Sequence, residues 1–525
     1  MQFLCQIKYK SLHQIKVNKY PNFKVMKKFL LLIVLFNIQY NAFSQRMHQK
    51  ISKNEGIKSL AMLKEFLSIP NDALNKEDIS KNILWSTDKL NDYGFETKLL
   101  TTSSLPLIVA SKKISDELPT IAFYMHLDGQ SVDASKWDQK SPWIPVVKKF
   151  ESNEWIKLDW DTIDDQVNEN LRIFARSSSD DKGPFIMLLT ALNVLDIYNK
   201  DPEFNIKLIL DFEEEKSSPG LPEAVSNYQS DLMADMLLIL DGPMHFSGKP
   251  TLVFGNRGIS SITLKTFGPK TPQHSGHYGN YIPNPALKLS QILSSMKSED
   301  GRVIIPGFYE GIKLSDETKK ILNNVPSAES SIKNRTKIKS NDKVGSNYQE
   351  SLQFPSLNIR GLQSGWVGDQ VRTIIPSTAT AEIDVRLVLE SNPEKLMTLI
   401  KNHIESLGYT ILQSHPTDKE RLEYEKIIQM NYKISYPAFR TPVDSKQGEW
   451  LKNILQEYYE TNPVLIRTSG GSVPISPFVN QLGIPSIGLP TVNLDNNQHS
   501  PNENLRLGNY FQGIESFVAI LLESF

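Results

Sequence analysis

The chain has 525 residues, and its 58 Lys and Arg residues almost balance its 59 Asp and Glu residues. A chain of this length exceeds the size at which one hydrophobic core stops growing, so we expect at least two domains. The balanced charge, without a long run of like charges, argues against binding to nucleic acid or to an anionic membrane surface. A small polar substrate fits this composition better.

Residues 1–45 form a leader that we exclude from the fold. A lysine pair precedes the apolar run Phe29–Phe36, and the small residues of Ala42-Phe43-Ser44 then offer a cleavage site. Because this run is far shorter than the roughly 20 residues that span a bilayer, we expect a signal peptide near residues 26–44 and an exported protein, periplasmic or secreted. No stable membrane span is expected after cleavage. A retained anchor is the alternative, and Met26 is an alternative start.

From residue 50 onward, helix-like and strand-like stretches alternate. Amphipathic spacing predicts a helix from Ser59 to the break at Pro70 and another over Ile79–Tyr93. Short strands are expected at residues 97–100 and 107–110. Continuous apolar runs are typical of buried strands in a mostly parallel sheet, and three of them follow: Thr120–Met125, Asn205–Leu210 and Asp235–Leu240.

Polar residues follow each of these three apolar runs directly. His126 and Asp128 come after the first, Glu213-Glu214-Glu215 after the second and Asp241 after the third. A further acidic pair, Asp180-Asp181, lies where a loop enters a predicted helix. Because the carboxyl ends of parallel strands meet at one edge of a sheet, these side chains predict a single crevice. Alone, each motif is equally typical of a solvated surface turn.

The middle of the chain has a different pattern, strand-rich and amphipathic. Strands are predicted at Ser260–Lys265 and Ala379–Leu389, and helices at Pro285–Met296 and Pro393–Leu407. We interpret this part as an inserted α+β domain with a polar, exposed excursion at Asp316–Ser346. The α/β pattern resumes with a helix at 445–459 and strands at 463–466 and 485–488. The predicted boundaries are 46–257 and 437–525 for the first domain, in two parts, and 258–436 for the insert.

A metal site in this chain must use histidine and carboxylate, because the single cysteine, Cys5, lies in the leader. His126 would bind through one ring nitrogen while Asp128, on the same side of an extended chain, accepts the other N–H. Asp180 would bridge two closely spaced ions, and Glu215 and Asp241 end strands at the same edge. A second histidine is needed, and four remain open at this point: His245, His274, His277 and His499.

Several short motifs occur in the order typical of one enzyme family. In chain order they are His126-Leu127-Asp128, Ser179-Asp180-Asp181-Lys182-Gly183-Pro184, Glu214-Glu215, Asp241, Asn256-Arg257-Gly258, His274-Ser275-Gly276, Arg372-Thr373-Ile374-Ile375-Pro376, Arg386-Leu387-Val388, Gly470-Gly471-Ser472-Val473-Pro474 and His499-Ser500. In these motifs the chain resembles dizinc metallopeptidase family twenty, which contains carnosinase, cytosolic nonspecific dipeptidase, aminoacylase and glutamate carboxypeptidase. The resemblance covers most of the mature chain. It implies an α/β zinc-exopeptidase catalytic domain with an inserted lid or dimerisation domain.

The resemblance also implies a ligand set. Two Zn²⁺ ions, with Mn²⁺ or Co²⁺ as substitutes, would be bound, one by His126, Asp180 and Asp241 and the other by Asp180, Glu215 and His499. Glu214 would be the general base that acts on a water between the ions, and Asp128 would be a further catalytic residue. The family has a cis peptide bond at the position of Asp180-Asp181.

The same resemblance implies the substrate contacts. Arg386 and Ser472 match positions that bind the terminal carboxylate of the substrate, for which the planar fork of arginine is suited. His274 resembles a histidine that stabilises the oxyanion from the neighbouring subunit, and Thr373 would assist from that subunit, so a homodimer is implied. Arg257 is interpreted as a support of the domain junction.

We therefore expect a hydrolase for dipeptides, or for the C-terminal amide bond of short peptides, next to a free carboxylate. An N-acyl-amino-acid deacylase is the alternative enzyme, and a metal-dependent binding protein without turnover is the alternative outside enzymes. The chain departs from the family where Ala175-Arg176-Ser177 replaces the frequent Gly-Arg-Gly. The long loop between Asp128 and Asp180 is predicted to line the mouth of the cleft with its tryptophans, Trp137, Trp143, Trp155 and Trp160.

Overall fold

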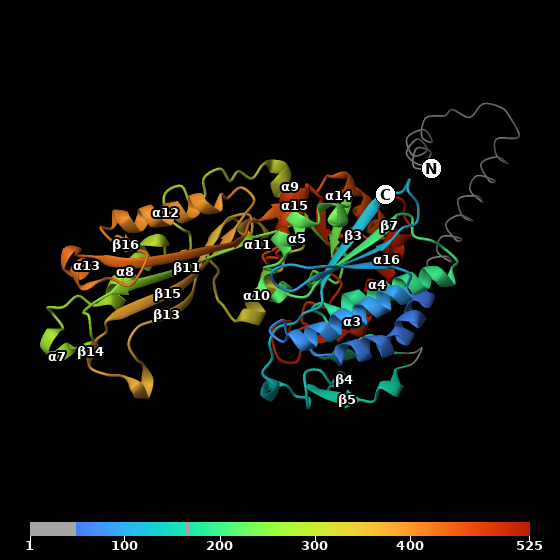
Figure 1. Ribbon diagram of the computed structural model, residues 1–525, viewed down its shortest axis with the longest axis horizontal. Helices are drawn as coiled ribbons and strands as arrows, with labels where there is room; N and C mark the ends of the chain where they lie inside the picture. The colour runs from blue at the N-terminus through green and yellow to red at the C-terminus, as the bar shows by residue number, and fades with distance from the viewer. Residues whose placement is uncertain (1–48, 164–166) are drawn as a thin grey trace, which may run out of the picture. The chain divides into compact units, whose positions relative to one another are not determined.

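The computed structural model describes residues 49–163 and 167–525 (Figure 1). The predicted signal peptide lies outside the described residues. Contacts within the chain divide it into residues 1–51 and residues 52–525, and the architecture below is that of the second unit. In the part of the chain that the structure describes, every helix is too short or too polar to cross a membrane.

A mixed eight-stranded sheet forms the centre of the catalytic part, in the order β1-β2-β7-β3-β8-β20-β9-β19. Its middle strands β7, β3, β8 and β20 are parallel to one another, whereas β1 and β2 are antiparallel at one edge. The continuous apolar runs explain the burial of the middle strands on both faces. The strands are β1 (Glu96–Leu100), β2 (Leu107–Lys112), β3 (Thr120–His126), β7 (Asn205–Asp211), β8 (Met236–Ile239), β9 (Thr251–Val253), β19 (Val464–Ile466) and β20 (Ser486–Gly488).

Helices cover both faces of this sheet (Figure 1). On one face α4 (Lys182–Ile197) packs against α16 (Leu507–Leu521), which also contacts α14 (Lys446–Tyr459). On the other face α5 (Leu221–Asn227) and α15 (Ser476–Leu482) share a core with the strands. The predicted α/β class with a largely parallel central sheet is confirmed. The remaining helices of this part are residues 52–67, α3 (Lys76–Asp92) and α6 (Gln229–Leu232).

A small antiparallel sheet, in the order β21-β6-β4-β5, connects the long loop to the C-terminal part of the chain. It consists of β4 (Val146–Glu151), β5 (Glu154–Leu158), β6 (Arg172–Phe174) and β21 (Asn504–Arg506). Trp155 packs edge-on against Phe174, with ring centroids 5.0 Å apart. Pairing of β6 with β21 places the segment after residue 174 beside the segment before residue 504.

A five-stranded sheet forms the core of the lid, the part between residues 258 and 436, in the order β13-β15-β11-β17-β16. Alternate residues of β11 and β15 are buried, because one face of the sheet packs on α8 and α12. The strands are β11 (Gly258–Phe267), β13 (Ser356–Gln363), β15 (Thr378–Leu387), β16 (Thr410–Leu412) and β17 (Ile427–Tyr436), and the helices are α8 (Pro285–Met296), α12 (Pro393–Ser406) and α13 (Asp418–Glu423).

The polar excursion of the lid is helical. Its elements are α9 (Asp316–Asn324), α10 (Glu329–Thr336) and α11 (Tyr348–Ser351), and α9 has one buried residue, Leu322, on an otherwise polar surface. A separate two-stranded antiparallel ribbon, the β12–β14 ribbon, pairs β12 (Gln273–His274) with β14 (Ile374–Ile375), and the short helix α7 (Ser275–Tyr278) follows β12 directly. The two-stranded sheet of β10 (Gly255–Asn256) and β18 (Phe439–Arg440) lies where the chain enters and leaves the lid.

Candidate metal centre

Three neighbouring strands deliver acidic and imidazole side chains to one edge of the central sheet. His126 is the last residue of β3, and the 3-10 turn Glu214–Lys216 follows β7 directly. Asp241 comes two residues after β8. Because β3 lies between β7 and β8 and is parallel to both, the three strand ends meet as expected.

Two groups of potential metal ligands share Asp180. The ligand atoms of His126, Asp180 and Asp241 lie within 4.8 Å of one another, as do those of Asp180, Glu215 and His499. Oδ1 of Asp180 is 2.8 Å from Nε2 of His126, whereas Oδ2 is 3.1 Å from Nε2 of His499. One carboxylate that presents each oxygen to a different cluster has the arrangement of a bridge between two ions. The nitrogen and oxygen donors fit zinc and also manganese or cobalt.

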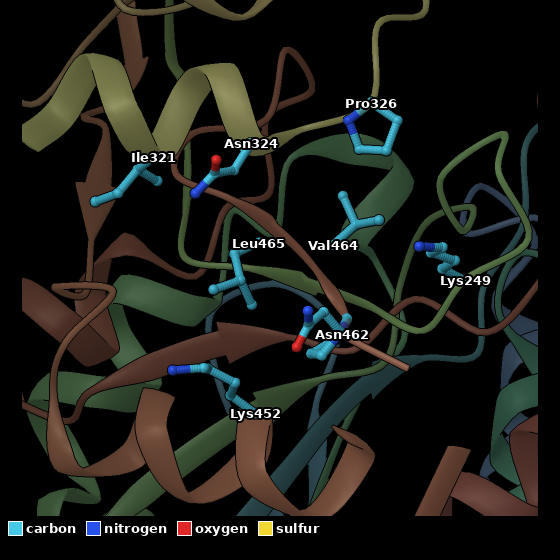
Figure 2. A pocket seen from close by; sticks show the side chains of 9 residues that line it. Lys249, Ile321, Asn324, Pro326, Lys452, Asn462, Val464 and Leu465 are labelled. Carbon is cyan, nitrogen blue, oxygen red and sulfur yellow. The ribbon is translucent and has the colours of Figure 1, made fainter. Parts of the chain in front are cut away.

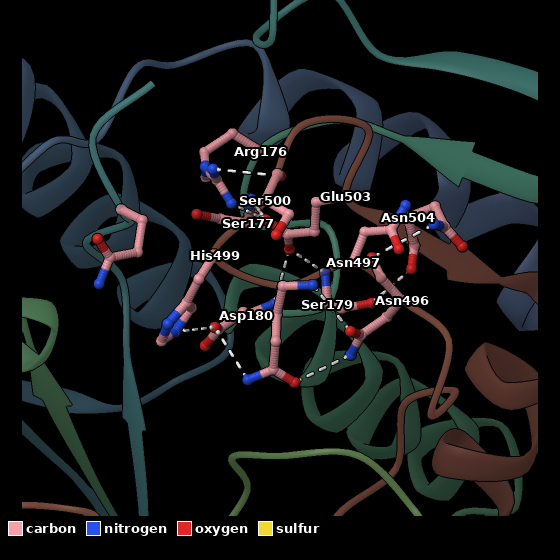
Figure 3. A network of polar contacts seen from close by, with 12 residues as sticks. Arg176, Ser177, Ser179, Asp180, Asn496, Asn497, His499, Ser500, Glu503 and Asn504 are labelled. Carbon is pink, nitrogen blue, oxygen red and sulfur yellow. Dashed lines mark hydrogen bonds and ion pairs between the residues drawn. The ribbon is translucent and has the colours of Figure 1, made fainter. Parts of the chain in front are cut away.

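The loop that carries Asp180 surrounds one buried carboxylate, that of Glu503 (Figure 3). Its Oε1 accepts the backbone N–H groups of Ser179 and Asp180 at 2.9 and 3.1 Å. Its Oε2 accepts the guanidinium of Arg176 at 2.6 Å and the N–H of Ser177 at 3.0 Å. The peptide bond between Asp180 and Asp181 is cis, as the family resemblance predicts.

Asp128 holds the turn that carries the two glutamates. Its carboxylate accepts the backbone N–H groups of Glu214 and Glu215, each at 3.1 Å. Nδ1 of His126 is 3.2 Å from the backbone oxygen of Asp128 and 3.4 Å from its Oδ1. Asp128 therefore orients one ligand through its ring and also fixes the neighbouring turn, a second task that the sequence does not indicate.

Burial and mutual charge strongly shift the titration of this cluster. Burial raises the pKa of Glu214 well above its usual range, the pKa of Glu215 to about 7 and that of Asp241 to about 6. The hydrogen bond with Asp180 raises the pKa of His499 to about 9. Burial would also raise the pKa of Asp180, but His126 and His499 lower it below its usual range. Without a metal the cluster therefore retains protons that a divalent ion would displace.

A cavity of about 810 Å³ lies over this edge and is also lined by the lid. Asp180, Glu214, Glu215, Asp241 and His499 line it, and so do Arg386 of β15 and Ser472 of the C-terminal part. Nη1 of Arg386 donates to Oγ of Ser472 at 2.7 Å. The structure thus brings the residues predicted to bind a carboxylate into the same cavity as the proposed ligands and base. His126 and Asp128 are buried behind the cavity wall.

His274 and Thr373 lie elsewhere, His274 in β12 and Thr373 directly before β14. The two residues are neighbours, since the N–H of Ser275 donates to the carbonyl of Thr373 at 3.2 Å. Both are exposed, and neither lines the cavity. Arg257 also lines the cavity and donates through Nε and Nη2 to the carbonyl of Gly470, each at 3.4 Å, across the junction between the lid and the catalytic part.

The prediction that the long loop lines the cleft with its tryptophans is wrong. Among the described residues of this loop, Gln130 alone lines the cavity. Trp137 packs over the guanidinium of Arg176, 5.5 Å from its ring centroid, and Nε1 of Trp160 donates to the carbonyl of Pro145. Trp155 packs against Phe150 and Phe174 of the small antiparallel sheet.

Three side chains that support the ligands were missed in the sequence analysis. Nε2 of Gln130 donates to Oε2 of Glu215 at 2.7 Å, and Nε2 of Gln498 is 3.3 Å from Oδ2 of Asp180. Glu503 is the third. Gln130 and Gln498 stand close in sequence to Asp128 and His499, and Glu503 stands four residues after His499. Proximity to a proposed ligand was the available signal.

A second cavity of about 480 Å³ lies between α9 of the lid and the segment around β19 (Figure 2). Its charged lining residues are Lys249 and Lys452, and Nζ of Lys452 is paired with Glu449 at 3.0 Å. Neither carboxylate nor imidazole is among the described residues that line it. It therefore lacks the groups that hydrolytic chemistry needs.

Known proteins resemble this chain in sequence and in fold. A family model described as "Peptidase dimerisation domain" matches residues 254–410. The chain is 24% identical to the Beta-Ala-His dipeptidase of Mus musculus over 485 residues, 88% of this chain and 92% of that protein. It is 28% identical to the Cys-Gly metallodipeptidase DUG1 of Candida albicans over 356 residues, 66% of this chain and 70% of that protein.

A solved structure agrees with these sequence matches. The M20 family metallo-carboxypeptidase Sso-CP2 from Sulfolobus solfataricus superposes with a TM-score of 0.73 at 26% identity, and the match covers 88% of this chain and 98% of that chain. The matched dimerisation domain is the part that forms the lid, and the shared carboxylate of Asp180 has the arrangement expected for a dinuclear metal site. In sequence and in fold this chain resembles M20 metallopeptidases, and residues 254–410 match their dimerisation domain.

Proposed function

We propose that the protein is an exported dinuclear zinc peptidase that hydrolyses dipeptides, or the C-terminal amide bond of short peptides. The observation that carries the proposal is the composition of the 810 Å³ cavity. One wall holds the ligands around Asp180 together with Glu214, and the lid side holds Arg386 bonded to Ser472. A substrate with a free carboxylate can therefore be held at one end while its amide bond lies at the metal ligands. The dipeptidase names of the relatives agree with this substrate class.

The residues of the chain divide the chemistry among them. Two bound divalent ions would polarise the amide carbonyl and lower the pKa of a water between them. Glu214, in the same cavity, takes the proton of the attacking water and passes it to the leaving amine. Arg386 and Ser472 bind the carboxylate and so fix the position of the amide bond.

The proposed enzyme is a homodimer. The "Peptidase dimerisation domain" match supports this proposal, as does the exposed position of His274 and Thr373 away from the cavity of their own chain. In the proposed dimer these two residues reach the site of the other subunit, where His274 donates a hydrogen bond to the oxyanion. Size determination by light scattering tests the dimer, and a monomer with full activity would contradict it.

An N-acyl-amino-acid deacylase is the second candidate, because the pair of Arg386 and Ser472 would hold the carboxylate of either substrate. The purified mature protein, loaded with Zn²⁺, is assayed against a dipeptide library and against matched N-acetyl amino acids. We expect hydrolysis of dipeptides with higher kcat/KM than that of the acetylated set. A higher kcat/KM for acetylated amino acids would establish the alternative. Metal analysis of the same preparation must show zinc, and a preparation that binds none would refute both.

Two further parts of the proposal need their own tests. The alternative outside enzymes is a binding protein without turnover. An inactive wild type, together with unchanged dipeptide affinity in Glu214→Gln, would support it.

Export is tested by N-terminal sequencing of the protein made in a bacterial host with an intact secretion system. We expect the mature chain to begin at Gln45 and to be recovered outside the cytoplasm, and a cytoplasmic chain that retains residues 26–44 would contradict export.

A further inference from the structure

We propose that Glu503 is the positioning residue of the metal-bridging carboxylate, and that it sets the affinity of both metal sites together. The proposal rests on the dinuclear centre proposed above. Glu503 is completely buried, with 0% of its surface exposed. It lies neither in the cavity nor in either group of ligands, so its role is to act through other residues.

The first step of the argument is the direction of its hydrogen bonds. A carboxylate offers about four acceptor positions, and a buried one must have them filled. Those of Glu503 are filled by one short stretch, residues 176–180, with two donors on each oxygen. This stretch ends at the proposed bridging ligand, and the last donor is the backbone N–H of Asp180 itself.

The second step is the position of Glu503 in the chain. It follows His499 by four residues and directly precedes β21, which pairs with β6 ahead of the Asp180 loop. Its own backbone carbonyl accepts the N–H of Ala175 at 3.1 Å, and the hydroxyl of Ser179 donates to the carbonyl of Asn504 at 2.8 Å. Glu503 therefore connects the loop with the bridging carboxylate to the loop with the second histidine (Figure 3).

The third step is the charge. Arg176 supplies the one cationic partner, at 2.6 Å, and both side chains are almost fully buried, so the pair lies in a medium of low dielectric. A neutral amide in place of the carboxylate would present an NH₂ group to donors, because a glutamine has one acceptor oxygen where the carboxylate has two. Glu503→Gln keeps the volume but leaves two of the donors without an acceptor, and the Asp180 loop must move.

The consequence for the metals follows from the bridge. A displaced Asp180 loses its position relative to both His126 and His499. The affinities of the two metal sites should therefore fall together. Residues that orient metal ligands typically contribute about 10- to 100-fold in affinity. The carboxylate anchor formed by Arg386 and Ser472 is on other elements, so KM for a dipeptide should change little when metal is saturating.

The experiment measures binding of Co²⁺ to the metal-free protein through its visible absorption, which reports the ions without reference to turnover. We expect Glu503→Gln to weaken both Co²⁺ sites in parallel, by about 10- to 100-fold. Asp495→Asn is the matched control. Asp495 lies in the same loop and pairs with Arg172 at 2.6 Å and with Asn493 at 3.1 Å, and it forms no hydrogen bond or ion pair with residues 176–181. This control should bind Co²⁺ as the wild type does.

A variant with a smaller change keeps the test decisive if Glu503→Gln does not fold. Glu503→Asp retains the charge but is one methylene shorter, so we expect a parallel loss at both sites that is smaller than that of Glu503→Gln. A folded Glu503 variant with wild-type Co²⁺ affinity, and only a lower Tm of the metal-free protein, would show a purely structural role and overturn the inference. A wild type that binds no Co²⁺ would instead overturn the proposed function.

Discussion

The metal edge of the central sheet and the β12–β14 ribbon differ in whether one chain brings the proposed site residues together. At the metal edge, His126, Asp180 and His499 come from distant parts of the sequence, and each histidine lies within ion-pair distance of Asp180. At the β12–β14 ribbon, His274 and Thr373 are next to each other, but neither lines the cavity that holds the other proposed site residues of their own chain. Chain topology alone assembles the first region, whereas the second reaches a catalytic site only in the proposed dimer.

This difference separates two kinds of site residue. Ligands at the ends of parallel strands depend on the sheet, so their geometry is set once the strands pair. The residues of the β12–β14 ribbon would depend on the proposed dimer, whose geometry a single chain does not set. The variants below test this difference. Changes at the metal edge should affect the site of the same subunit, whereas changes in the β12–β14 ribbon should affect the site of the other subunit.

Loss of the shared carboxylate should have the largest effect. Asp180→Ala removes a ligand from both clusters, so we expect neither ion to be retained and activity to fall below detection. Metal analysis after gel filtration checks this, and equal metal content in wild type and variant would exclude the bridge. Asp181 is the control, because it belongs to neither group of ligands and burial raises its pKa well above the usual range. Asp181→Asn should keep both ions.

Loss of the proposed base should leave the metals in place. Glu214→Gln retains the size of the side chain, so we expect normal metal content and a kcat lower by about 10²- to 10⁴-fold, the usual contribution of general base catalysis. Steady-state kinetics and metal analysis of one preparation check both expectations. Glu213→Gln is the control, since Glu213 accepts the N–H of Gly220 at 2.8 Å and does not line the cavity. A similar loss of kcat in both variants would remove the special role of Glu214.

Loss of His274 in the β12–β14 ribbon should impair the site of the partner subunit. His274→Ala should lower kcat by about 100-fold, because one oxyanion donor is typically worth about 3 kcal/mol. Mixing this variant with Glu214→Gln then distinguishes the two subunits as sources of the histidine. In a mixed dimer one site combines an intact Glu214 with an intact His274 of the other chain, while the second site has neither.

Random reassociation of equal amounts therefore predicts recovery to about a quarter of wild-type activity, since half of the dimers are mixed and one of their two sites is complete. Each variant alone must stay inactive under the same dissociation and reassociation conditions. Recovery would not occur if His274 acted within its own chain, because each site of a mixed dimer would then lack one of the two groups. Absence of recovery from folded, mixed dimers would thus contradict the action of His274 across the interface.

Much of the metal edge follows from sequence, for identifiable reasons. The apolar runs before His126, Glu214 and Asp241 define strands that the structure confirms, with β3 ending one residue later than predicted. The common edge follows because these strands are parallel. The choice of His499 from four open histidines came from the family resemblance, and the chain pattern alone left it undecided.

Other features depend on tertiary contacts that no local pattern reports. Glu503 looks like one more acid in a polar loop, and its role depends on donors more than 300 positions away. The tryptophans of the long loop suggested an exposed cleft lining, yet strand pairing places Trp155 against Phe174. The excursion at 316–346 was predicted only as polar and exposed, because its helices bury few residues. In each case the missing information was which distant segment covers the residue.

The smallest expected effect concerns the carboxylate anchor, and it sharpens the comparison because lid and catalytic part meet there within one chain. Ser472→Ala removes the hydroxyl that accepts from Nη1 of Arg386 at 2.7 Å. The donor is a charged guanidinium and the bond is only partly buried, so its contribution lies near the lower end of the range of about 1.5–3 kcal/mol for hydrogen bonds to charged groups, and we expect KM for dipeptides to rise by about tenfold with kcat unchanged. Ser469→Ala is the matched control, because Ser469 lines the same cavity and accepts the N–H of Gly471. A fall in kcat without a change in KM would place Ser472 in the chemical step and not in the anchor. A rise in KM confined to Ser472→Ala would show that this contact between lid and catalytic part serves substrate binding within a single subunit. The β12–β14 ribbon, in contrast, is proposed to act on the other subunit.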